Sequence, residues 1–311
     1  MQVADTEIDL FIAADGTTYK LGPLKGRNVL RDEGSGMPPV EHITQRGPFQ
    51  DGETLHRVYL RPRTVQYFIR NTSCSRDDYW LARSGLLDAI RPNRGLAGIL
   101  RKIFPGNVRR DLTVTILEGP KFEPRGNDWD EFSFQEMLRF IAYDPLYFNP
   151  VAQIATIEHQ CIATAGGFPY IFPFLFDAGE CQLIFPITFP ITFDTFNRTY
   201  QINYIGNWED FPTIRVTGPS SSCVITNTTT GKVLEVIYSL AAGEYYDINL
   251  AYGYKTITKN DGANLLAYLD DDSDLTDWSL EPGVNNLTIT MPGASASSVV
   301  TITYYERYLG I

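Results

Sequence analysis

The chain has 311 residues, of which 43% are hydrophobic and 20% charged, and it holds 18 Phe, 18 Tyr, 19 Pro and 25 Gly. This composition excludes global disorder and favours many short strands joined by tight turns, a mainly β class. Residues 1–150 hold 20 basic and 20 acidic side chains, whereas residues 151–311 hold 6 and 17 and so carry the whole net charge of −11. An acidic second half argues against nucleic-acid binding there, while a neutral, arginine-rich first half suits polar protein interfaces.

The cysteines and the apolar runs predict neither a metal site nor a membrane segment. Of the four cysteines only Cys161 has a histidine nearby, His159, so buried structural thiols are expected, with no metal and no cofactor. The amino terminus lacks a signal-peptide pattern, and the most apolar run, Phe168–Phe176, is short and interrupted by two prolines. A soluble protein made in the cytoplasm is therefore predicted.

Apolar alternation in the first half predicts a series of short strands. The Gly- and Pro-rich stretch Gly22–Pro39 predicts a long loop. The wider segment Gly22–Gly52 is expected to contain a long mobile loop that becomes ordered only on assembly. The predicted strands are Ile8–Ile12, Thr17–Leu21, Leu55–Leu60, Thr64–Arg70, Ile99–Phe104 and Val108–Leu117.

One helix is predicted between two of these strands. Ser75 with Asp78 three residues later marks its start, Arg91-Pro92 marks its end, and arginines toward that end suit the helix dipole. Glu131–Tyr143 fits either a helix or a strand. The shift in charge balance and two nearby prolines predict a domain boundary at Pro150, which gives domains 1–150 and 151–311.

The second half is organised around Asn207–Gly231. There the alternating strand Thr213–Thr217 is broken by Gly218-Pro219, and a second strand ends in an Asn- and Gly-containing turn. Strands and turns spaced this regularly predict an antiparallel β-sandwich. A Phe-Pro repeat occupies Phe168–Phe196. The predicted strands are Val151–Glu158, Tyr200–Ile205, Thr213–Thr217, Cys223–Thr226, Lys232–Leu240, Tyr246–Leu250, Tyr254–Thr258, Leu287–Met291 and Val299–Glu306.

A few residues of the second half could carry chemistry, but each also fits an ordinary turn. Glu209, Asp210 and Glu244 are candidate glycosidase carboxylates, but acidic turn residues are the norm on a β-rich surface. The acidic run Asp270–Asp274 lacks the glycine and terminal glutamate of a calcium loop, and Thr230-Gly231-Lys232 is only the end of a phosphate-binding motif. No catalytic, cofactor-binding or metal-binding residue is therefore predicted, and the chain is not expected to be an enzyme.

Six segments together resemble the siphophage distal tail proteins. In the second half these are FPTIRVTGPSSSCVITNTTTG (211–231), AGEYYD (242–247), DGAN (261–264) and WSLEPGVN (278–285). In the first half they are GPFQDGETLHRVYLRPRTV (47–65) and FIAYDP (140–145). This sequence departs slightly from the family pattern, because Asp247 or Asn249 stands near the position where the family usually has an acidic residue. Each motif alone is weak, but their shared order makes the resemblance specific, and it covers nearly the whole chain.

The resemblance implies a structural component of a long non-contractile phage tail tip. It implies that domain 1–150 forms a homo-hexameric ring below the tail tube protein and holds the central tail hub protein, around a lumen through which DNA is ejected. It also implies that domain 151–311 is a galectin-like sandwich offering a docking platform to receptor-binding or side-fibre proteins, with the tape measure protein as a further partner. The protein would then be located in the virion, without specific nucleic-acid or membrane binding.

Two other function classes stay open. A carbohydrate-binding module for host-surface adhesion would use Trp208, Tyr245, Tyr246 and Trp278 to stack on sugar rings, although core packing of these aromatics is the favoured interpretation. A glycosidase would use the acidic residues named above. Binding of glycans by the isolated second half, or sugar release from cell-wall preparations, would distinguish these classes from a structural protein.

Overall fold

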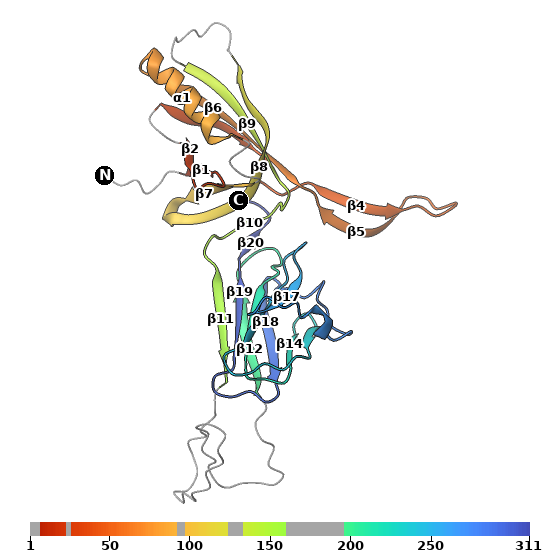
Figure 1. The fold of residues 1–311 in the computed structure, drawn as a ribbon. Coiled ribbons are helices and arrows are strands. Elements are labelled where there is room, and N and C mark those ends of the chain that lie inside the picture. The colour runs from red at the N-terminus through yellow and green to blue at the C-terminus, as the bar shows by residue number, and fades with distance from the viewer. Residues whose placement is uncertain (1–6, 23–25, 92–96, 124–132, 160–195) are drawn as a thin grey trace, which may run out of the picture. The chain divides into compact units, whose positions relative to one another are not determined.

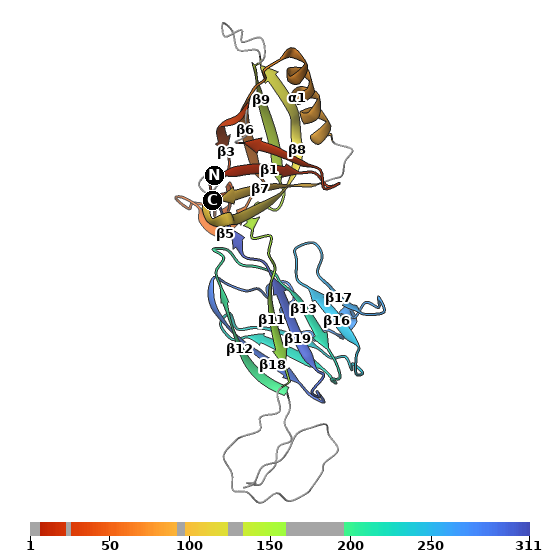
Figure 2. The ribbon, with the colours of Figure 1, turned by 90° about the vertical axis from the view of Figure 1, so that its left-hand side faces the viewer.

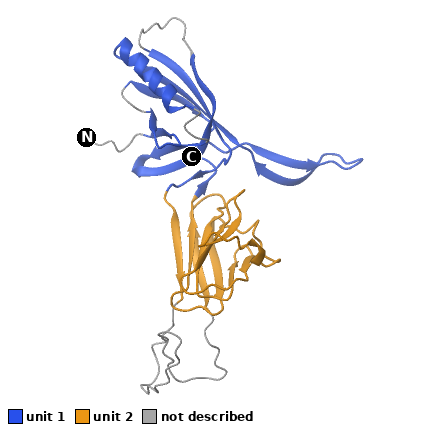
Figure 3. Cartoon of the chain, viewed as in Figure 1, with its two compact units in different colours: residues 1–150, 307–311 blue, residues 151–306 orange. Residues whose placement is uncertain are grey.

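The computed structural model describes residues 7–22, 26–91, 97–123, 133–159 and 196–311, which are mainly β with one α-helix among them (Figure 1). The chain divides into two compact units, residues 1–150 with 307–311 and residues 151–306 (Figure 3). The predicted boundary at Pro150 assigns residues 307–311 to the second domain, whereas their strand pairs within the first unit. The predicted mainly β class with antiparallel sheets is confirmed.

The first unit is built on an antiparallel sheet in the order β2-β1-β7-β8-β9-β6-β3, to which β10 and β20 add a short pair (Figures 1 and 2). Side chains on β6 and β9 are buried at every second position, so their apolar rows form one side of the core. The strands are β1 (Ile8–Ile12), β2 (Thr18–Gly22), β3 (Arg27–Glu33), β6 (Arg63–Thr72), β7 (Gly98–Phe104), β8 (Val108–Glu123), β9 (Ser133–Ala142), β10 (Tyr147–Phe148) and β20 (Arg307–Tyr308).

The two outer strands of this sheet approach each other at Gly22 on β2. A Cβ atom at this position would lie 2.9 Å from Cγ2 of Val29 and 3.1 Å from its backbone nitrogen on β3. Such a distance leaves no room for a side chain, so glycine is required here by close backbone approach. The sheet thereby curls toward a barrel, which protects both of its edges.

Helix α1 (Arg76–Ala89) begins where it was predicted to begin. The backbone N–H of Asp78 donates to Oγ of Ser75 at 3.2 Å, and that hydroxyl donates to Oδ2 of Asp78 at 2.7 Å. The predicted arginines do not fall in its last turn, because the helix ends at Ala89 and Arg91 lies beyond its cap. Its inner face packs Leu86 into the core and sets Tyr79 edge-on against Phe134 of β9, with ring centroids 5.1 Å apart.

Two predictions for the first half are corrected or resolved by the structure. The loop prediction for Gly22–Pro39 is wrong, because β3 lies there and pairs with β6. Its alternation is hidden in the sequence by a bulge at Leu30, whose side chain is exposed. The ambiguous segment Glu131–Tyr143 contains β9, because pairing with β6 and β8 on its two sides outweighs its helical apolar spacing.

The second unit is a β-sandwich of two antiparallel sheets, one in the order β11-β19-β13-β16-β17 and one in the order β12-β18-β14-β15. Both sheets contribute alternate side chains to one continuous apolar core around the fully buried Trp278. The strands are β11 (Gln153–Glu158), β12 (Phe196–Tyr204), β13 (Thr213–Thr217), β14 (Cys223–Asn227), β15 (Lys232–Val236), β16 (Tyr245–Asn249), β17 (Thr256–Lys259), β18 (Gly283–Met291) and β19 (Val299–Tyr304).

The stretch predicted to organise the second half does link the two sheets. Strand β13 joins the five-stranded sheet, and the chain then crosses to β14 of the four-stranded sheet through the cis Gly218–Pro219 bond. The turn that follows is held by Asn227, which is buried and whose side-chain amide donates to the Ser279 carbonyl at 3.0 Å. The predicted strand Lys232–Leu240 is shorter than expected and ends at Val236.

Some predictions fall on residues outside those that the structure describes. The Phe-Pro repeat lies almost wholly within residues 160–195, as do Cys161 and Cys181. Of the two cysteines in the described part of the chain, Cys223 is buried and Cys74 is exposed, and both are free thiols.

The core of the second unit predicts the outcome of a charge substitution. Val236→Asp would place an unpaired carboxylate at a site that is 1% exposed, which costs several kcal/mol, comparable to the stability of a domain. We expect this variant to lose the urea transition of the second unit, measured by circular dichroism. Ile237→Asp, at the next position but exposed, should leave the transition in place. Equal effects of the two variants would contradict the assignment of the core.

Glu136 is an unusual residue in the core-facing row of β9. It is 2% exposed, and neither carboxyl oxygen has a hydrogen-bond partner within the described residues. Burial raises its pKa to about 7, while Asn71 and the guanidinium of Arg27 lower it in part. Because the folded pKa lies above the ordinary value, the contribution of Glu136 to stability is most favourable at acidic pH and falls as pH rises from about 4.5 through about 7.

Replacing this carboxyl by an amide should therefore stabilise the first unit at alkaline pH. We expect Glu136→Gln to raise the free energy of unfolding by on the order of 2 kcal/mol at pH 8 and to change it little at pH 4.5. The measurement is urea unfolding at both pH values, in the transition that Val236→Asp does not affect. Glu53→Gln, at an exposed site, is the control and should shift neither value. A gain that is equal at both pH values would contradict the pKa assignment.

Candidate functional site: exposed surfaces of the first unit

A two-stranded ribbon extends from the first unit and is exposed on both of its faces (Figure 1). It consists of β4 (Val40–Gln45) and β5 (Thr54–Leu60), which pair with each other and with no other strand of the described residues. Its apolar side chains are exposed, and an isolated hairpin of this kind is marginally stable in water. The ribbon is therefore a candidate interaction surface. Its exposed apolar residues are Ile43, Leu55, Val58 and Tyr59.

Polar contacts hold the ribbon in its extended form. Arg61 donates two hydrogen bonds to Glu41 across the strands, Nε to Oε2 at 3.0 Å and Nη2 to Oε1 at 2.8 Å. This pair lowers the pKa of Glu41, chiefly through the hydrogen bonds. The guanidinium of Arg57 lies over the Tyr59 ring, 4.8 Å from its centroid.

The far end of the ribbon is a tight turn, Gly47–Gln50. The backbone N–H of Gln50 donates to the Gly47 carbonyl at 3.2 Å, and the Gln50 side chain accepts from the Gly47 N–H at 2.9 Å and donates to Oγ1 of Thr54 at 2.9 Å. Phe49 is the third residue of the turn, with φ of 64°, and its side chain is fully exposed.

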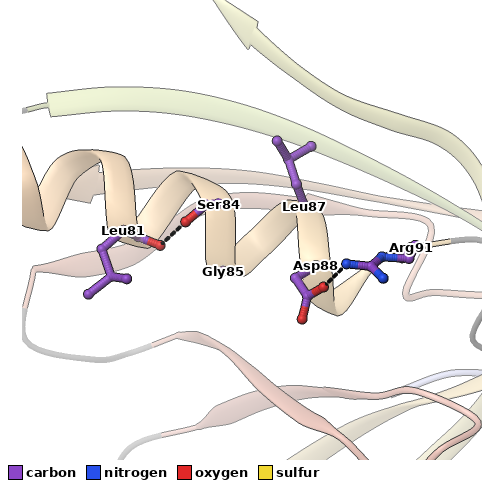
Figure 4. Close-up of a pocket in the computed structure, with 6 residues that line it drawn as sticks. All are labelled: Leu81, Ser84, Gly85, Leu87, Asp88 and Arg91. Carbon is purple, nitrogen blue, oxygen red and sulfur yellow. Dashed lines mark hydrogen bonds and ion pairs between the residues drawn. The ribbon is translucent and has the colours of Figure 1, made fainter.

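The outer face of α1 forms a second exposed surface. Leu81 is 71% and Leu87 47% exposed, and the two side chains point to different sides of the helix, while Gly85 leaves the backbone bare one turn after Leu81 (Figure 4). Together with Ser84, Asp88 and Arg91 these residues line a shallow depression of about 580 Å³ (Figure 4). An ion pair between Asp88 and Arg91 forms its polar end. Trp80, one turn earlier, is also exposed.

A buried ionic cluster fixes the strands behind these surfaces. Nζ of Lys102, which is 3% exposed, lies 2.6 Å from Oδ2 of Asp32, 3.5 Å from Oε1 of Glu7 and 3.8 Å from Oδ1 of Asp9. Burial raises the pKa of Asp9 to about 6, and the Lys102 charge offsets part of this shift. For Lys102, burial lowers the pKa, but Asp9 and Asp32 outweigh it, so its pKa is raised. The cluster joins β1, β3 and β7.

Arg63 at the start of β6 anchors the end of the chain in the first unit. Its guanidinium is buried, donates to the carbonyls of Gly34, Ser35 and Leu309, and lies over the Tyr147 ring at 4.7 Å. Strand β20 pairs with β10 beside it.

The three acidic residues weighed as catalytic carboxylates each make a contact within the second unit. Asp210 is buried and accepts a hydrogen bond from the Tyr305 backbone N–H at 2.9 Å. Glu209 accepts from the Ser279 hydroxyl at 3.3 Å. Glu244 accepts from the Ala241 N–H at 3.0 Å and pairs with Lys259 at 2.9 Å, contacts that lower its pKa.

The acidic loop Asp270–Asp274 also has a structural role. Oδ2 of Asp274 accepts from the Val233 N–H at 3.0 Å, and its Oδ1 pairs with Lys232 at 3.2 Å, which ties the loop to β15. Lys232, the end of the incomplete phosphate motif, is used in this pair. Within the described ranges no group of His, Cys, Asp and Glu side chains could hold a metal ion.

The aromatics considered for sugar stacking are mostly core residues. Tyr246 and Trp278 are fully buried, as the core-packing interpretation predicts, and the Tyr245 ring is covered by Arg215 at 4.2 Å. Trp208 is partly buried. Among the described residues of this unit, the most exposed aromatics are Tyr252, Tyr254 and Tyr268, none of which was a candidate for sugar stacking.

The helix of the described residues is not long and apolar enough to cross a membrane.

Comparison with known proteins finds a family similarity in the second half of the chain. Residues 205–308 match the family model of the siphovirus-type tail component, C-terminal domain. The predicted resemblance to siphophage distal tail proteins is thereby confirmed. None of the curated proteins matches the chain.

Solved phage structures resemble the chain over nearly its full length. The crystal structure of the phage SPP1 Dit (gp 19.1) protein, described as a paradigm of the hub adsorption apparatus in phages infecting Gram-positive hosts, aligns with a TM-score of 0.60 and 15% identity. The alignment covers 97% of this chain and 99% of that one. At this identity the match shows a shared fold. The phage P2 baseplate in its activated conformation with Ca aligns with a TM-score of 0.45 and 9% identity, over 96% and 98% of the two chains.

The contacts of Asp210 in the second unit predict that two acidic residues differ in their effect on stability. Asp210→Ala would remove the buried carboxylate that accepts from the Tyr305 N–H, so we expect a loss of about 1–3 kcal/mol in the free energy of unfolding. Urea unfolding of the second-unit transition measures it. Asp271→Ala, at an exposed site in the acidic loop, is the matched control and should have no measurable effect. If both variants behave alike, the proposed structural role of Asp210 is wrong.

Proposed function

We propose that this tail component is a ring-forming hub protein of a siphophage tail tip. In this proposal the first unit assembles into a closed ring of six copies that lies below the tail tube protein and holds the central tail hub protein, with the tape measure protein as a further neighbour. The family match of residues 205–308 is the observation that carries the proposal. The exposed apolar ribbon and the outer face of α1 support it, because such surfaces are typical of subunits that assemble.

The second unit is proposed as the platform on which receptor-binding or side-fibre proteins dock. It carries the net negative charge of the chain, which favours partners with basic docking surfaces. We further propose that the chain acts without catalysis, since the carboxylates that a glycosidase would use are engaged in strand and turn contacts. The protein would be made in the host cytoplasm and reside in the virion.

A sugar-binding role for the second unit has less support. Of the four aromatics that such a role would use, Tyr246 and Trp278 are buried in the core. We therefore favour protein docking over adhesion to glycans as the role of this unit.

The ring is tested by the mass of the assembled protein. We expect the purified full chain to show, by native mass spectrometry and light scattering, a species six times the mass of one chain, with rings visible by electron microscopy. The expected contacts are polar and apolar, so moderate salt should leave the ring intact. A chain that stays monomeric at all accessible concentrations would contradict the proposal, and a closed ring of another size would correct the copy number alone.

A further inference from the structure

Residues 266–277 of the second unit run along the outer edge of strand β15, and we call them the covering segment. The Ile237 backbone N–H donates to the Tyr268 carbonyl at 2.8 Å, and the Asp274 N–H donates to the Val233 carbonyl at 2.7 Å. These backbone bonds hold the covering segment beside β15, although it is not itself a strand. Its exposed side chains therefore lie at the edge of the four-stranded sheet.

An exposed aromatic ring lies at the start of the covering segment. Tyr268 is 47% exposed, and its ring meets the Tyr238 ring edge-on, with centroids 4.9 Å apart. Tyr238 packs against the core in turn, so the Tyr268 ring is supported from within the unit. Leu266, at the start of the same short 3-10 helix, is also exposed. A supported aromatic ring loses little conformational freedom on binding and is suited to protein contacts.

A second exposed ring is held near the end of the covering segment. Nζ of Lys255 donates to the carbonyls of Leu275 and Thr276, both at 2.9 Å, and lies 4.8 Å from the centroid of the Phe211 ring. The Tyr252 ring packs on Phe211, with centroids 4.4 Å apart, and is 67% exposed. Lys255 thus ties the turn that carries Tyr252 to the covering segment.

The carboxylates between these two rings have no basic partner within the part of the chain that the structure describes. Asp271 and Asp272 are both exposed, and neither forms an ion pair there. The three lysines of the second unit, Lys232, Lys255 and Lys259, are engaged with other groups of the unit. The positive charge that would complement Asp271 and Asp272 must therefore come from a partner.

The covering segment has the length of a short extended peptide. Tyr268 and Thr276 are eight positions apart in the sequence, so their Cα atoms lie at most about 26 Å apart. About eight residues of an extended partner segment would span this distance. Such a segment could reach both exposed rings and the carboxylates between them.

We propose that the covering segment, together with Tyr252, binds a basic segment of a protein docked on the tail tip. The inference rests on the proposed docking role of the second unit and names the surface and the chemistry of its partner. Arginine or lysine side chains would pair with Asp271 and Asp272, and an arginine would also stack on Tyr268 or Tyr252. A neutral glycan would gain no Coulombic attraction from these carboxylates, so a basic protein segment is favoured.

Photo-cross-linking in intact tails tests the position of this surface. A photoreactive benzoylphenylalanine replaces Tyr268 in one variant of the full chain and Tyr252 in a second. In the control variant it replaces Thr199, an exposed residue of β12 at the opposite edge of the four-stranded sheet. We expect irradiation to link positions 268 and 252 to a different tail protein, within a few residues of an arginine or lysine when mapped by mass spectrometry. Position 199 should not form this link.

Binding of the mapped segment tests its chemistry. A fluorescent synthetic peptide with the cross-linked sequence is titrated with the full chain, and its anisotropy is measured. We expect at least tenfold weaker binding when Asp271→Asn and Asp272→Asn are combined, and also on raising sodium chloride from about 0.1 to about 0.5 M. Tyr268→Ala should weaken binding similarly. Glu158→Gln, at an exposed site on β11, is the matched control and should leave binding unchanged.

The outcomes separate this surface from the docking role itself. A chain that is absent from purified tails would overturn the proposed function and the inference together. A chain that is present, with links to another tail protein from position 199 and from neither 268 nor 252, would overturn the surface and leave the docking role standing. Peptide binding that the paired aspartate changes leave intact would overturn the basic partner. Links from position 268 only to a glycan, or only to a second copy of this chain, would also overturn the inference.

Discussion

The pairing of β8 with strands on both of its sides is the constraint on which the first unit depends. Its 16 residues pair with β7 over their first part and with β9 over their second, and Phe148 of β10 pairs with Asp111 between them. Asp111 is buried and receives two hydrogen bonds from Arg101, at 2.7 Å and 2.6 Å. Because one strand serves both parts of the sheet, the rows that contain Leu112 and Leu138 face a single core. The positions of α1 and the ribbon follow, since both are attached to β6 in that sheet.

Local pattern predicted most of the strands, but not the contacts that depend on distant pairing. Period-2 alternation was sufficient for β13 and β14, and the Ser75 cap was sufficient for the start of α1. Strand β3 was missed because its side chains are largely polar and its alternation is broken at Leu30, so only its pairing with β6 defines it. The exposed surfaces of the ribbon and of α1 were harder still to predict from the sequence. Neither Gly85 nor Phe49 differs by type from an ordinary helix or turn residue, and only their exposure and backbone geometry distinguish them.

The acidic residues of the second unit show why composition alone does not identify a site. Carboxylates in turns next to aromatic residues are also found in glycosidases, so Glu209, Asp210 and Glu244 were reasonable candidates. Their partners are backbone N–H groups, a serine hydroxyl and a lysine, which are the contacts of groups that stabilise turns and strand ends. The net charge of −11 carried by residues 151–311 is a property of the second half as a whole, where it acts on the approach of partners.

Stability and assembly place opposite demands on the first unit. Within the sheet, alternate side chains are buried in one apolar core, and the buried carboxyl of Glu136 is an exception in its row. On the ribbon and the outer face of α1, apolar side chains are exposed, a bulky residue holds a positive φ, and a helix carries a central glycine. Each of these features lowers the stability of the isolated chain. Binding of a partner to these two surfaces, which are attached at opposite ends of β6, would offset part of that loss of stability.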